Sequence, residues 1–204
     1  MPKTKKIKQE TYLVTGGSGF CGVEIVKFLL KKNQKVKVLD IEPLPKELDN
    51  KDIEFFKIDI RNKKEVIKVC KGIDRIIHTI ALVPISKAGT KFIEVNVNGT
   101  RNILEAALQN KVKKVVHISS SAVQLTDKNP VDEYDRYNPI GPYAKSKLQG
   151  EFVCKEYIKK GLDVDIIRPR TVLGTGRMGI FDMFFNWICN GKRVYLLGGG
   201  KNTI

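Results

Sequence analysis

The chain has 204 residues, of which 42% are hydrophobic and 29% are charged, a composition typical of a globular domain. Its formal net charge is +15, but most basic residues are lysines spread over expected helix faces and turns. They lack the interleaved aromatic residues that stack on exposed bases, so we expect no nucleic-acid partner. No apolar run approaches the roughly 20 residues of a membrane-spanning helix, so we expect no membrane partner either.

Residues 1–10 contain four lysines and form an expected basic, flexible arm, without the apolar core of a secretory signal. The four cysteines, Cys21, Cys70, Cys154 and Cys189, are far apart in sequence. They show no metal-ligand spacing, so we expect no metal site. Unpatterned cysteines in a lysine-rich chain predict a reducing, cytoplasmic location.

Strand and helix patterns alternate from Thr11 onward, which predicts a parallel sheet with helices packed on its faces. We expect strands at residues 12–14, 36–40, 53–60, 73–81, 115–118, 165–167 and 194–197. We expect helices from about Phe20 to Leu30, around residues 66–70, over 91–110, from about Pro142 to Tyr157, and over 181–188.

The turn after the first expected strand reads Thr15-Gly16-Gly17-Ser18-Gly19-Phe20-Cys21-Gly22. Gly16, Gly19 and Gly22 let the backbone reverse tightly, approach a ligand closely and begin a helix close to the sheet. The N–H groups and positive end of a helix that begins near Phe20 would hold a pyrophosphate. Because a strand precedes this turn and a helix follows it, we expect a dinucleotide to bind here.

Asp40 ends the second expected strand, 24 residues after Gly16. A carboxylate at this place can accept hydrogen bonds from both hydroxyls of the adenosine ribose and would repel a 2′-phosphate. The next residue, Ile41, offers no positive charge that would neutralise such a phosphate. The sequence therefore favours NAD over NADP, with the alternative that Asp40 merely ends a strand.

Tyr143 and Lys147 are four residues apart, so they share one face of an expected helix. A tyrosine with a pKa near ~10 is a poor base at neutral pH, and a nearby ammonium lowers that pKa. The run 119–121, three serines at the end of the fifth expected strand, offers a hydroxyl at the edge where α/β sheets bind ligands. With the glycine turn, these residues predict nicotinamide-dependent hydride chemistry.

The chain after residue 10 resembles the extended short-chain dehydrogenases/reductases, the NAD-dependent epimerase/dehydratase family. The matching motifs are Thr15–Gly22, Leu39-Asp40, Asp59-Ile60, His78, Asn96–Thr100, Ser119–Val123, Pro142–Lys147 and Arg168-Pro169. The resemblance implies an α/β fold with a Rossmann-type, doubly wound parallel sheet and a smaller C-terminal substrate domain. We expect the NAD-binding domain at residues 11–178 and the start of the substrate-binding region at 179–204. Most of that region is expected to be missing, because the family continues well beyond Ile204.

Carried over by position, Tyr143 is the general base, and Lys147 lowers its pKa and holds the nicotinamide ribose. Val123 of the family's serine motif selects Ser120 as the catalytic serine, ahead of Ser121. The resemblance places Asp59 and Ile60 beside the adenine and Asn96 in support of the site, while His78 and His117 are predicted to be packed strand residues. The complete expected set of NAD-binding residues is Gly16, Gly19, Phe20, Gly22, Asp40, Asp59, Ile60, Ala81, Asn96, Tyr143, Lys147 and Pro169.

Two departures from the family pattern bear on the reaction. Sugar 4,6-dehydratases and decarboxylases of the family carry an acidic residue directly after the catalytic serine or threonine, where this chain has Ser121 and Ala122. Without that carboxylate an elimination lacks its acid–base pair, which disfavours dehydration. Second, Gln124-Leu125 stand where the family usually has Tyr-Gly, so we expect the loop that meets the sugar to differ.

The first functional hypothesis is an NAD-dependent oxidoreductase/epimerase that acts on a nucleotide sugar through transient hydride transfer. The second is an NAD-dependent alcohol dehydrogenase similar to the 3β-hydroxysteroid dehydrogenase group. The third is an NAD-sensing binding module, against which the intact Ser120, Tyr143 and Lys147 argue. The family often pairs through the helices expected at 91–110 and 143–157, which implies a homodimer. We expect the residues that choose the substrate to lie mainly beyond Ile204, so the sequence does not reveal the substrate.

Overall fold

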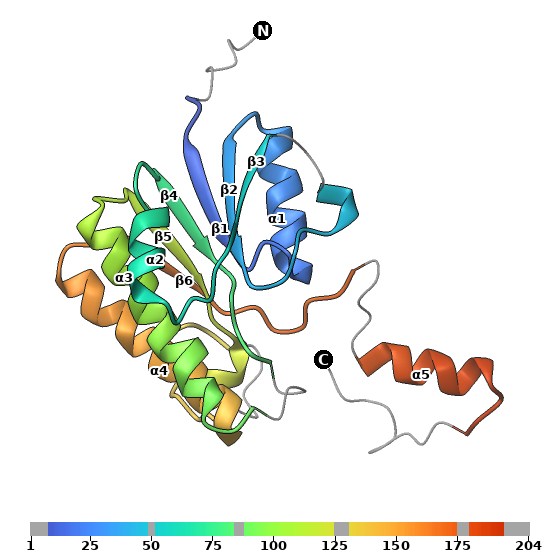
Figure 1. The fold of residues 1–204 in the computed structure, drawn as a ribbon. Helices are drawn as coiled ribbons and strands as arrows, with labels where there is room; N and C mark the ends of the chain where they lie inside the picture. Colours follow the sequence, from blue (N-terminus) through green and yellow to red (C-terminus); the bar gives the residue numbers. More distant parts are fainter. Residues whose placement is uncertain (1–7, 49–51, 84–87, 125–130, 175–179, 194–204) are drawn as a thin grey trace, which may run out of the picture. The chain divides into compact units, whose positions relative to one another are not determined.

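The computed structural model describes residues 8–48, 52–83, 88–124, 131–174 and 180–193. It divides into two compact units, Met1–Arg170 and Thr171–Ile204, which are considered separately below. The first unit contains a six-stranded sheet in the order β3-β2-β1-β4-β5-β6, with every neighbouring pair parallel (Figure 1). The strands are β1 (Thr11–Thr15), β2 (Lys35–Asp40), β3 (Ile53–Lys57), β4 (Arg75–His78), β5 (Lys114–Ile118) and β6 (Val164–Ile167).

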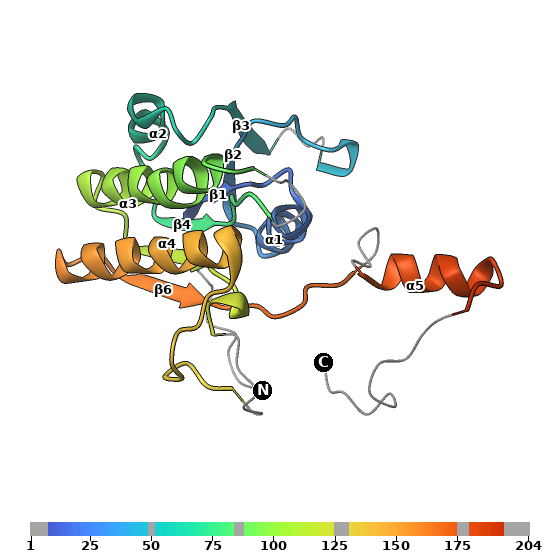
Figure 2. The ribbon, with the colours of Figure 1, turned by 90° about the horizontal axis from the view of Figure 1, so that it is seen from below.

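Helices cover both faces of this sheet (Figure 2). On one face lies α1 (Phe20–Lys31), near the short 3₁₀ turn η1 (Lys46–Leu48). On the other face lie α2 (Lys63–Val69), α3 (Thr100–Gln109) and α4 (Gly141–Lys159). Two buried apolar clusters, one on each side of the sheet, hold these layers together. The predicted doubly wound α/β fold is confirmed.

Six of the predicted strands are present, but two are shorter than expected. The third ends at Lys57 rather than at residue 60, because the Asp59 carboxylate accepts a hydrogen bond from Arg61 N (2.9 Å) and turns the chain. The fourth covers Arg75–His78 rather than residues 73–81, because Leu82 beyond it is bound by the side chain of Asn96. The predicted strand at 194–197 lies outside the described residues.

The helix predicted over residues 91–110 is divided. Its first part, η3 (Ile93–Gly99), is a π-helix, and α3 follows it directly. Gly99 packs closely on Ile60, three residues beyond the end of β3, since a Cβ at Gly99 would lie 2.7 Å from Ile60 Cγ2. The spacing of hydrophobic residues could not distinguish the two helix types, because a π-turn interrupts an α-helix only locally. Such turns occur frequently at functional sites.

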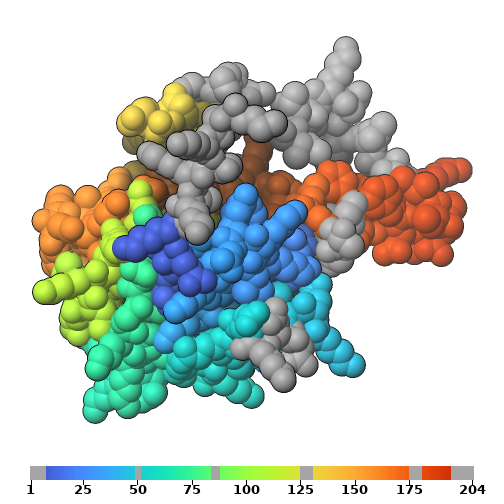
Figure 3. All heavy atoms as spheres, turned by 90° about the horizontal axis from the view of Figure 1, so that it is seen from above, coloured from blue at the N-terminus to red at the C-terminus, as the bar shows by residue number. Residues whose placement is uncertain are grey.

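The amino ends of the strands form an edge rich in ion pairs. Glu10 binds Arg75 and Lys113, and Lys113 also binds Asp74 (2.7 Å). Figure 3 looks onto this edge, where the dark-blue start of the described chain lies beside green segments from the middle of the sequence. Arg75 and Lys113 hold the pKa of Glu10 below its ordinary value. Part of the basic surface is therefore paired with carboxylates, which agrees with its interpretation as a solvated face.

In the second unit, the described residues form α5 (Ile180–Cys189), where the sequence predicts a helix over 181–188. Within the described parts of the chain, no helix combines the length and the apolarity that a membrane crossing requires.

Candidate active site

The glycine turn between β1 and α1 has the geometry of a ligand cradle. Gly16 has a φ of +77°, and a Cβ there would lie 2.6 Å from Thr79 Oγ1. A Cβ on Gly22 would overlap the carbonyl of Gly16, so neither position accepts a side chain. No side chain caps the start of α1, which begins at Phe20, directly after Gly19. The bare turn and the helix N-terminus fit the pyrophosphate of a dinucleotide.

Asp40 lies at the carboxyl end of β2, and its carboxylate is fixed beside this turn. Its Oδ2 accepts a hydrogen bond from Ser18 N (3.0 Å), and its Oδ1 accepts one from Glu42 N (3.1 Å). A carboxylate has about four acceptor positions, so it can still accept hydrogen bonds from two ribose hydroxyls. The placement agrees with the predicted choice of a cofactor without a 2′-phosphate.

Asp59 and Ile60, the expected adenine neighbours, follow β3. The Asp59 carboxylate binds Arg61, which also reaches Glu94 on η3 (2.9 Å), and Arg61 holds the pKa of Asp59 below its ordinary value. The side chain of Ile60 is buried, and its carbonyl accepts a hydrogen bond from Asn102 Nδ2 (3.0 Å). The structure thus offers an ion pair rather than a lone carboxylate at the expected adenine position.

Asn96 is buried in η3 and binds the backbone that follows β4. Its Oδ1 accepts a hydrogen bond from Leu82 N (2.8 Å), and its Nδ2 donates to Leu82 O (3.1 Å) and to Ser146 Oγ (2.9 Å). Ser146 in turn donates to the carbonyl of Tyr143 (2.7 Å). Asn96 therefore holds the segment containing Ala81 against the first turn of α4.

A second buried chain of hydrogen bonds leads from the glycine turn to Asn96. Thr100 donates its hydroxyl proton to Asn96 O (2.7 Å), so its Oγ1 must accept from His78 Nε2 (3.1 Å). Nδ1 of His78 then accepts from Thr15 Oγ1 (2.7 Å), the residue just before the first glycine. His78 is accordingly a neutral imidazole that bridges β1 and α3, a packed strand residue as the sequence predicted.

The carboxyl end of β5 and the face of α4 bring the predicted catalytic residues together. Lys147 is buried, and its Nζ donates to Ile118 O (2.7 Å), two residues before Ser120. Tyr143 lies one turn earlier on the same helix, and its ring packs edge-on against Phe92. Ser120 Oγ accepts from Ala122 N (3.2 Å), which leaves the hydroxyl proton of Ser120 available to a ligand.

Burial sets the protonation of Lys147. Desolvation lowers its pKa to about 8, and the nearby Cys154 and Glu151 oppose that effect. The ammonium form therefore prevails at neutral pH. Of its three N–H groups, one binds Ile118 O, so the remaining donors can face a ribose or a phenolate.

Two charged residues of this region carried no predicted role, Glu151 and Arg168. Glu151 is fully buried one turn after Lys147, and it accepts a hydrogen bond from Ser119 Oγ (2.6 Å). Arg168 follows β6 and forms a bidentate ion pair with Glu151, both contacts being 2.8 Å. Pro169, the next residue, accepts from Ser121 N (3.0 Å). A signal was present in the sequence, since Tyr143, Lys147 and Glu151 recur at intervals of four on one helix face.

Comparison with known proteins fits this geometry. The model of the NAD dependent epimerase/dehydratase family matches residues 12–203. The chain belongs to this family. The predicted family is confirmed, and with it the dependence on NAD that the family's description states. The roles of individual residues of this family member stay predictions.

The relatives of this chain include proteins named for each of the two reactions that the sequence suggests, epimerisation and alcohol dehydrogenation. It is 32% identical to a putative UDP-glucose 4-epimerase of Methanocaldococcus jannaschii, over 94% of this chain and 67% of that protein. It is 31% identical to a 3-beta-hydroxysteroid dehydrogenase of Mycolicibacterium neoaurum, over 93% of this chain and 55% of that protein. Among solved structures, MoeE5 in complex with UDP-glucuronic acid and NAD is 28% identical with a TM-score of 0.79, over 87% of this chain and 60% of that one.

The chain spans about half the length of several of the curated relatives that it matches. The activity of a whole protein is therefore a matter for proposal.

Proposed function

We propose that this chain supplies the NAD-binding domain and the catalytic side chains of an enzyme that epimerises a nucleotide sugar, with Tyr143 as the base. The observation that carries the proposal is the hydrogen bond between α4 and the carboxyl end of β5. The contact from Lys147 to Ile118 O supports a site at the sheet edge that combines the tyrosine, the lysine and Ser120. The putative UDP-glucose 4-epimerase and MoeE5 with UDP-glucuronic acid support a nucleotide sugar as the substrate class.

Each side chain has a definite task in this proposal. NAD held at the glycine turn and Asp40 would supply reversible hydride transfer at the carbon that carries the substrate hydroxyl. Tyr143 accepts the hydroxyl proton and later gives it back. Lys147, charged at neutral pH, stabilises the phenolate form of that tyrosine. Ser120 donates its free hydroxyl proton to the same substrate oxygen and fixes its position.

The cofactor proposal assigns NAD to the edge formed by the glycine turn and Asp40. The positive φ of Gly16 and the uncapped start of α1 suit the pyrophosphate. Asp40 suits the adenosine ribose, and its charge disfavours a 2′-phosphate. The proposed site also includes residues that follow the carboxyl ends of β3, β4 and β6, namely Asp59, Ile60, Ala81 and Pro169. Asn96 is included because its side chain binds the backbone that follows β4.

An isotope experiment tests the epimerase. UDP-glucose deuterated at the carbon that changes configuration is incubated with the chain and NAD. Because the hydride is removed and returned within one site, we expect the epimer to retain the deuterium, as measured by mass spectrometry. Washed-out deuterium, or no epimer while other UDP- and dTDP-sugars also fail, would contradict the proposal.

The second candidate is an NAD-dependent dehydrogenase of a sterol or another alcohol. It is favoured by the 31% identity to the 3-beta-hydroxysteroid dehydrogenase. Incubation of the chain and NAD with a sterol separates the two candidates, since a dehydrogenase then accumulates the reduced cofactor in proportion to product. An epimerase leaves the cofactor oxidised after each turnover.

We also propose that the protein is a homodimer that pairs through η3, α3 and α4. The outer surface of these helices carries a groove whose lining mixes apolar and charged side chains. The lining residues are Val97, Arg101, Gln149, Phe152, Val153 and Glu156. The ring of Phe152 is half exposed, which a partner surface would cover. We expect sedimentation velocity to give a dimer mass and Phe152→Glu to give a monomer; a monomeric wild type contradicts this pairing.

A further inference from the structure

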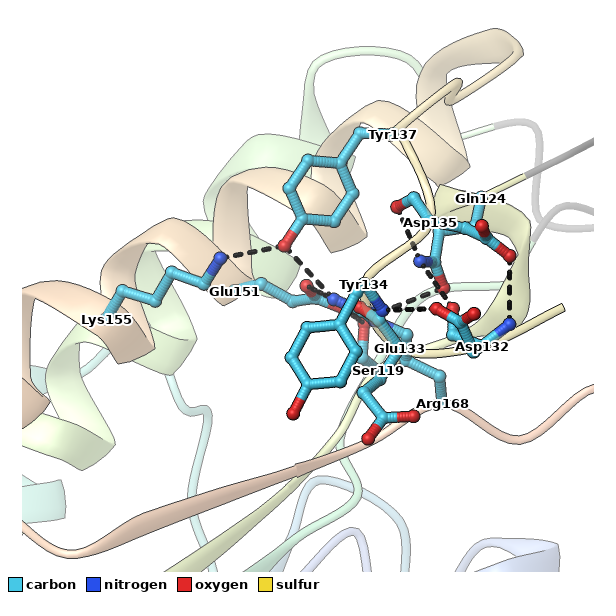
Figure 4. A network of polar contacts seen from close by, with 10 residues as sticks. All are labelled: Ser119, Gln124, Asp132, Glu133, Tyr134, Asp135, Tyr137, Glu151, Lys155 and Arg168. Atoms are coloured by element: carbon cyan, nitrogen blue, oxygen red, sulfur yellow. Dashed lines mark hydrogen bonds and ion pairs between the residues drawn. The ribbon is translucent and has the colours of Figure 1, made fainter.

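Arg168 contacts four other residues through one guanidinium group (Figure 4). Its Nε and Nη2 bind Glu151, and Nη2 also donates to Tyr137 Oη (3.1 Å). Its Nη1 donates to Gln124 Oε1 (2.9 Å) and to Glu133 O (3.0 Å). These contacts use all five N–H groups of the side chain. A buried ion pair stabilises one arrangement only when its remaining donors are satisfied, and this pair meets that condition.

Gln124 has one possible orientation in this network. Its Nε2 donates to Asp132 O (3.0 Å) and to Asp135 O (2.7 Å), which can only accept. Its Oε1 faces Arg168, which can only donate. The side chain is 5% exposed, so loss of either amide N–H would leave a carbonyl of the segment unpaired.

The segment bound by Gln124 connects two catalytic elements of the proposed site. Gln124 follows η4 (Ser121–Val123), which begins directly after Ser120. Asn138 at the other end donates its N–H to Val123 O (2.9 Å), and α4 with Tyr143 begins three residues later. Residues 131–138 are thus fixed between the serine and the tyrosine, at the edge where α/β sheets bind their ligands.

We infer that Gln124 is a positioning residue: its amide, oriented by Arg168, fixes residues 131–138 as a preformed wall of the pocket for the sugar. The inference rests on the proposed function for the nature of the ligand. The hydrogen bonds from the Gln124 amide to this segment do not depend on that function. It accounts for a glutamine where the family usually has a tyrosine, because a phenol has a single O–H donor and cannot donate to two carbonyls at once.

The hold is tested by hydrogen–deuterium exchange on the whole chain. Gln124→Glu keeps the shape and the acceptor that faces Arg168 but removes both N–H donors. We expect the amides of residues 131–138 to exchange at least about tenfold faster, since two hydrogen bonds are lost. Gln124→Met is expected to act likewise. Gln109→Glu, the same change at an exposed site on α3, is expected to leave these amides unchanged. Equal exchange in wild type and both Gln124 variants would overturn the inference.

A kinetic readout separates positioning from a general loss of structure. For the nucleotide sugar turned over by the wild type, we expect Gln124→Glu to raise KM by about tenfold while the Kd for NAD stays unchanged. Parallel weakening of NAD binding would mean a structural role and overturn the inference. If the wild type turns over no nucleotide sugar, the proposed function fails. The exchange experiment then still decides whether Gln124 holds the segment.

Discussion

Replacement of Tyr143 by phenylalanine is expected to lower kcat by about 10²–10⁴-fold, the usual contribution of a positioned general base. The phenyl ring retains the packing against Phe92 (centroid distance 6.3 Å), so the fold and the start of α4 stay intact. Only the group that exchanges a proton with the substrate is removed. We therefore expect the Kd for NAD, measured by calorimetry, to stay close to that of the wild type.

Tyr157→Phe is the matched control, because Tyr157 lies on the same helix and its hydroxyl donates to Glu105 at 3.4 Å. We expect this variant to keep wild-type kcat. Unchanged turnover in Tyr143→Phe would assign the proton transfer to another group. A wild type that binds NAD and shows no turnover with any sugar or sterol would instead favour the NAD-sensing module.

The cofactor side of the site was predictable because its signals are local. A glycine turn between a strand and a helix, followed by Asp40 at the end of the next strand, depends on chain positions within one βαβ unit. Tyr143 and Lys147 were predictable for the same reason, since both belong to one helix. Parallel strands then bring these separate units to one edge of the sheet, so element order alone placed them together.

Contacts across the fold could not be predicted from local patterns. Arg168 and Glu151 are 17 residues apart on different elements, and nothing in their spacing indicates a buried bidentate pair. Asp59 is predicted to flank the adenine, and that prediction stays open, but the ion pair of its carboxylate with Arg61 was not predicted. Gln124 could be identified as a departure from the family. Its hydrogen bonds to the carbonyls of Asp132 and Asp135 depend on the folded chain, so they could not be predicted.

Acidification from about pH 6.5 to about pH 5 is expected to destabilise the fold strongly, through two buried histidines. Burial lowers the pKa of His78 to about 3 and the pKa of His117 well below its ordinary value, and the charge of Lys147 adds to both effects. In the unfolded chain both imidazoles take up protons near pH ~6.5. The unfolded state then binds more protons than the folded state, so the stability present above that pH is lost as the pH falls.

Each histidine contributes a slope of at most about 1.4 kcal/mol per pH unit, and the two together about twice that. Urea unfolding at a series of pH values measures the slope as a falling midpoint with an unchanged m-value. Carboxylates with lowered pKa values, such as Asp59, lose their stabilising effect only at lower pH, near and below their ordinary pKa of ~4. The interval above about pH 5 therefore reports the histidines.

The variant His117→Phe tests how much of this slope of unfolding free energy against pH comes from His117. Within the described residues neither ring nitrogen of His117 has a hydrogen-bond partner, and its ring lies 5.3 Å from that of His78. An apolar ring at this position removes one titrating group and two unpaired polar atoms, so stability at neutral pH should be kept. We expect the slope to fall by about half, because His78 alone remains to take up a proton on unfolding. A slope unchanged in this variant would mean that His117 titrates normally in the folded protein, and that its burial is offset by a partner such as an ordered water.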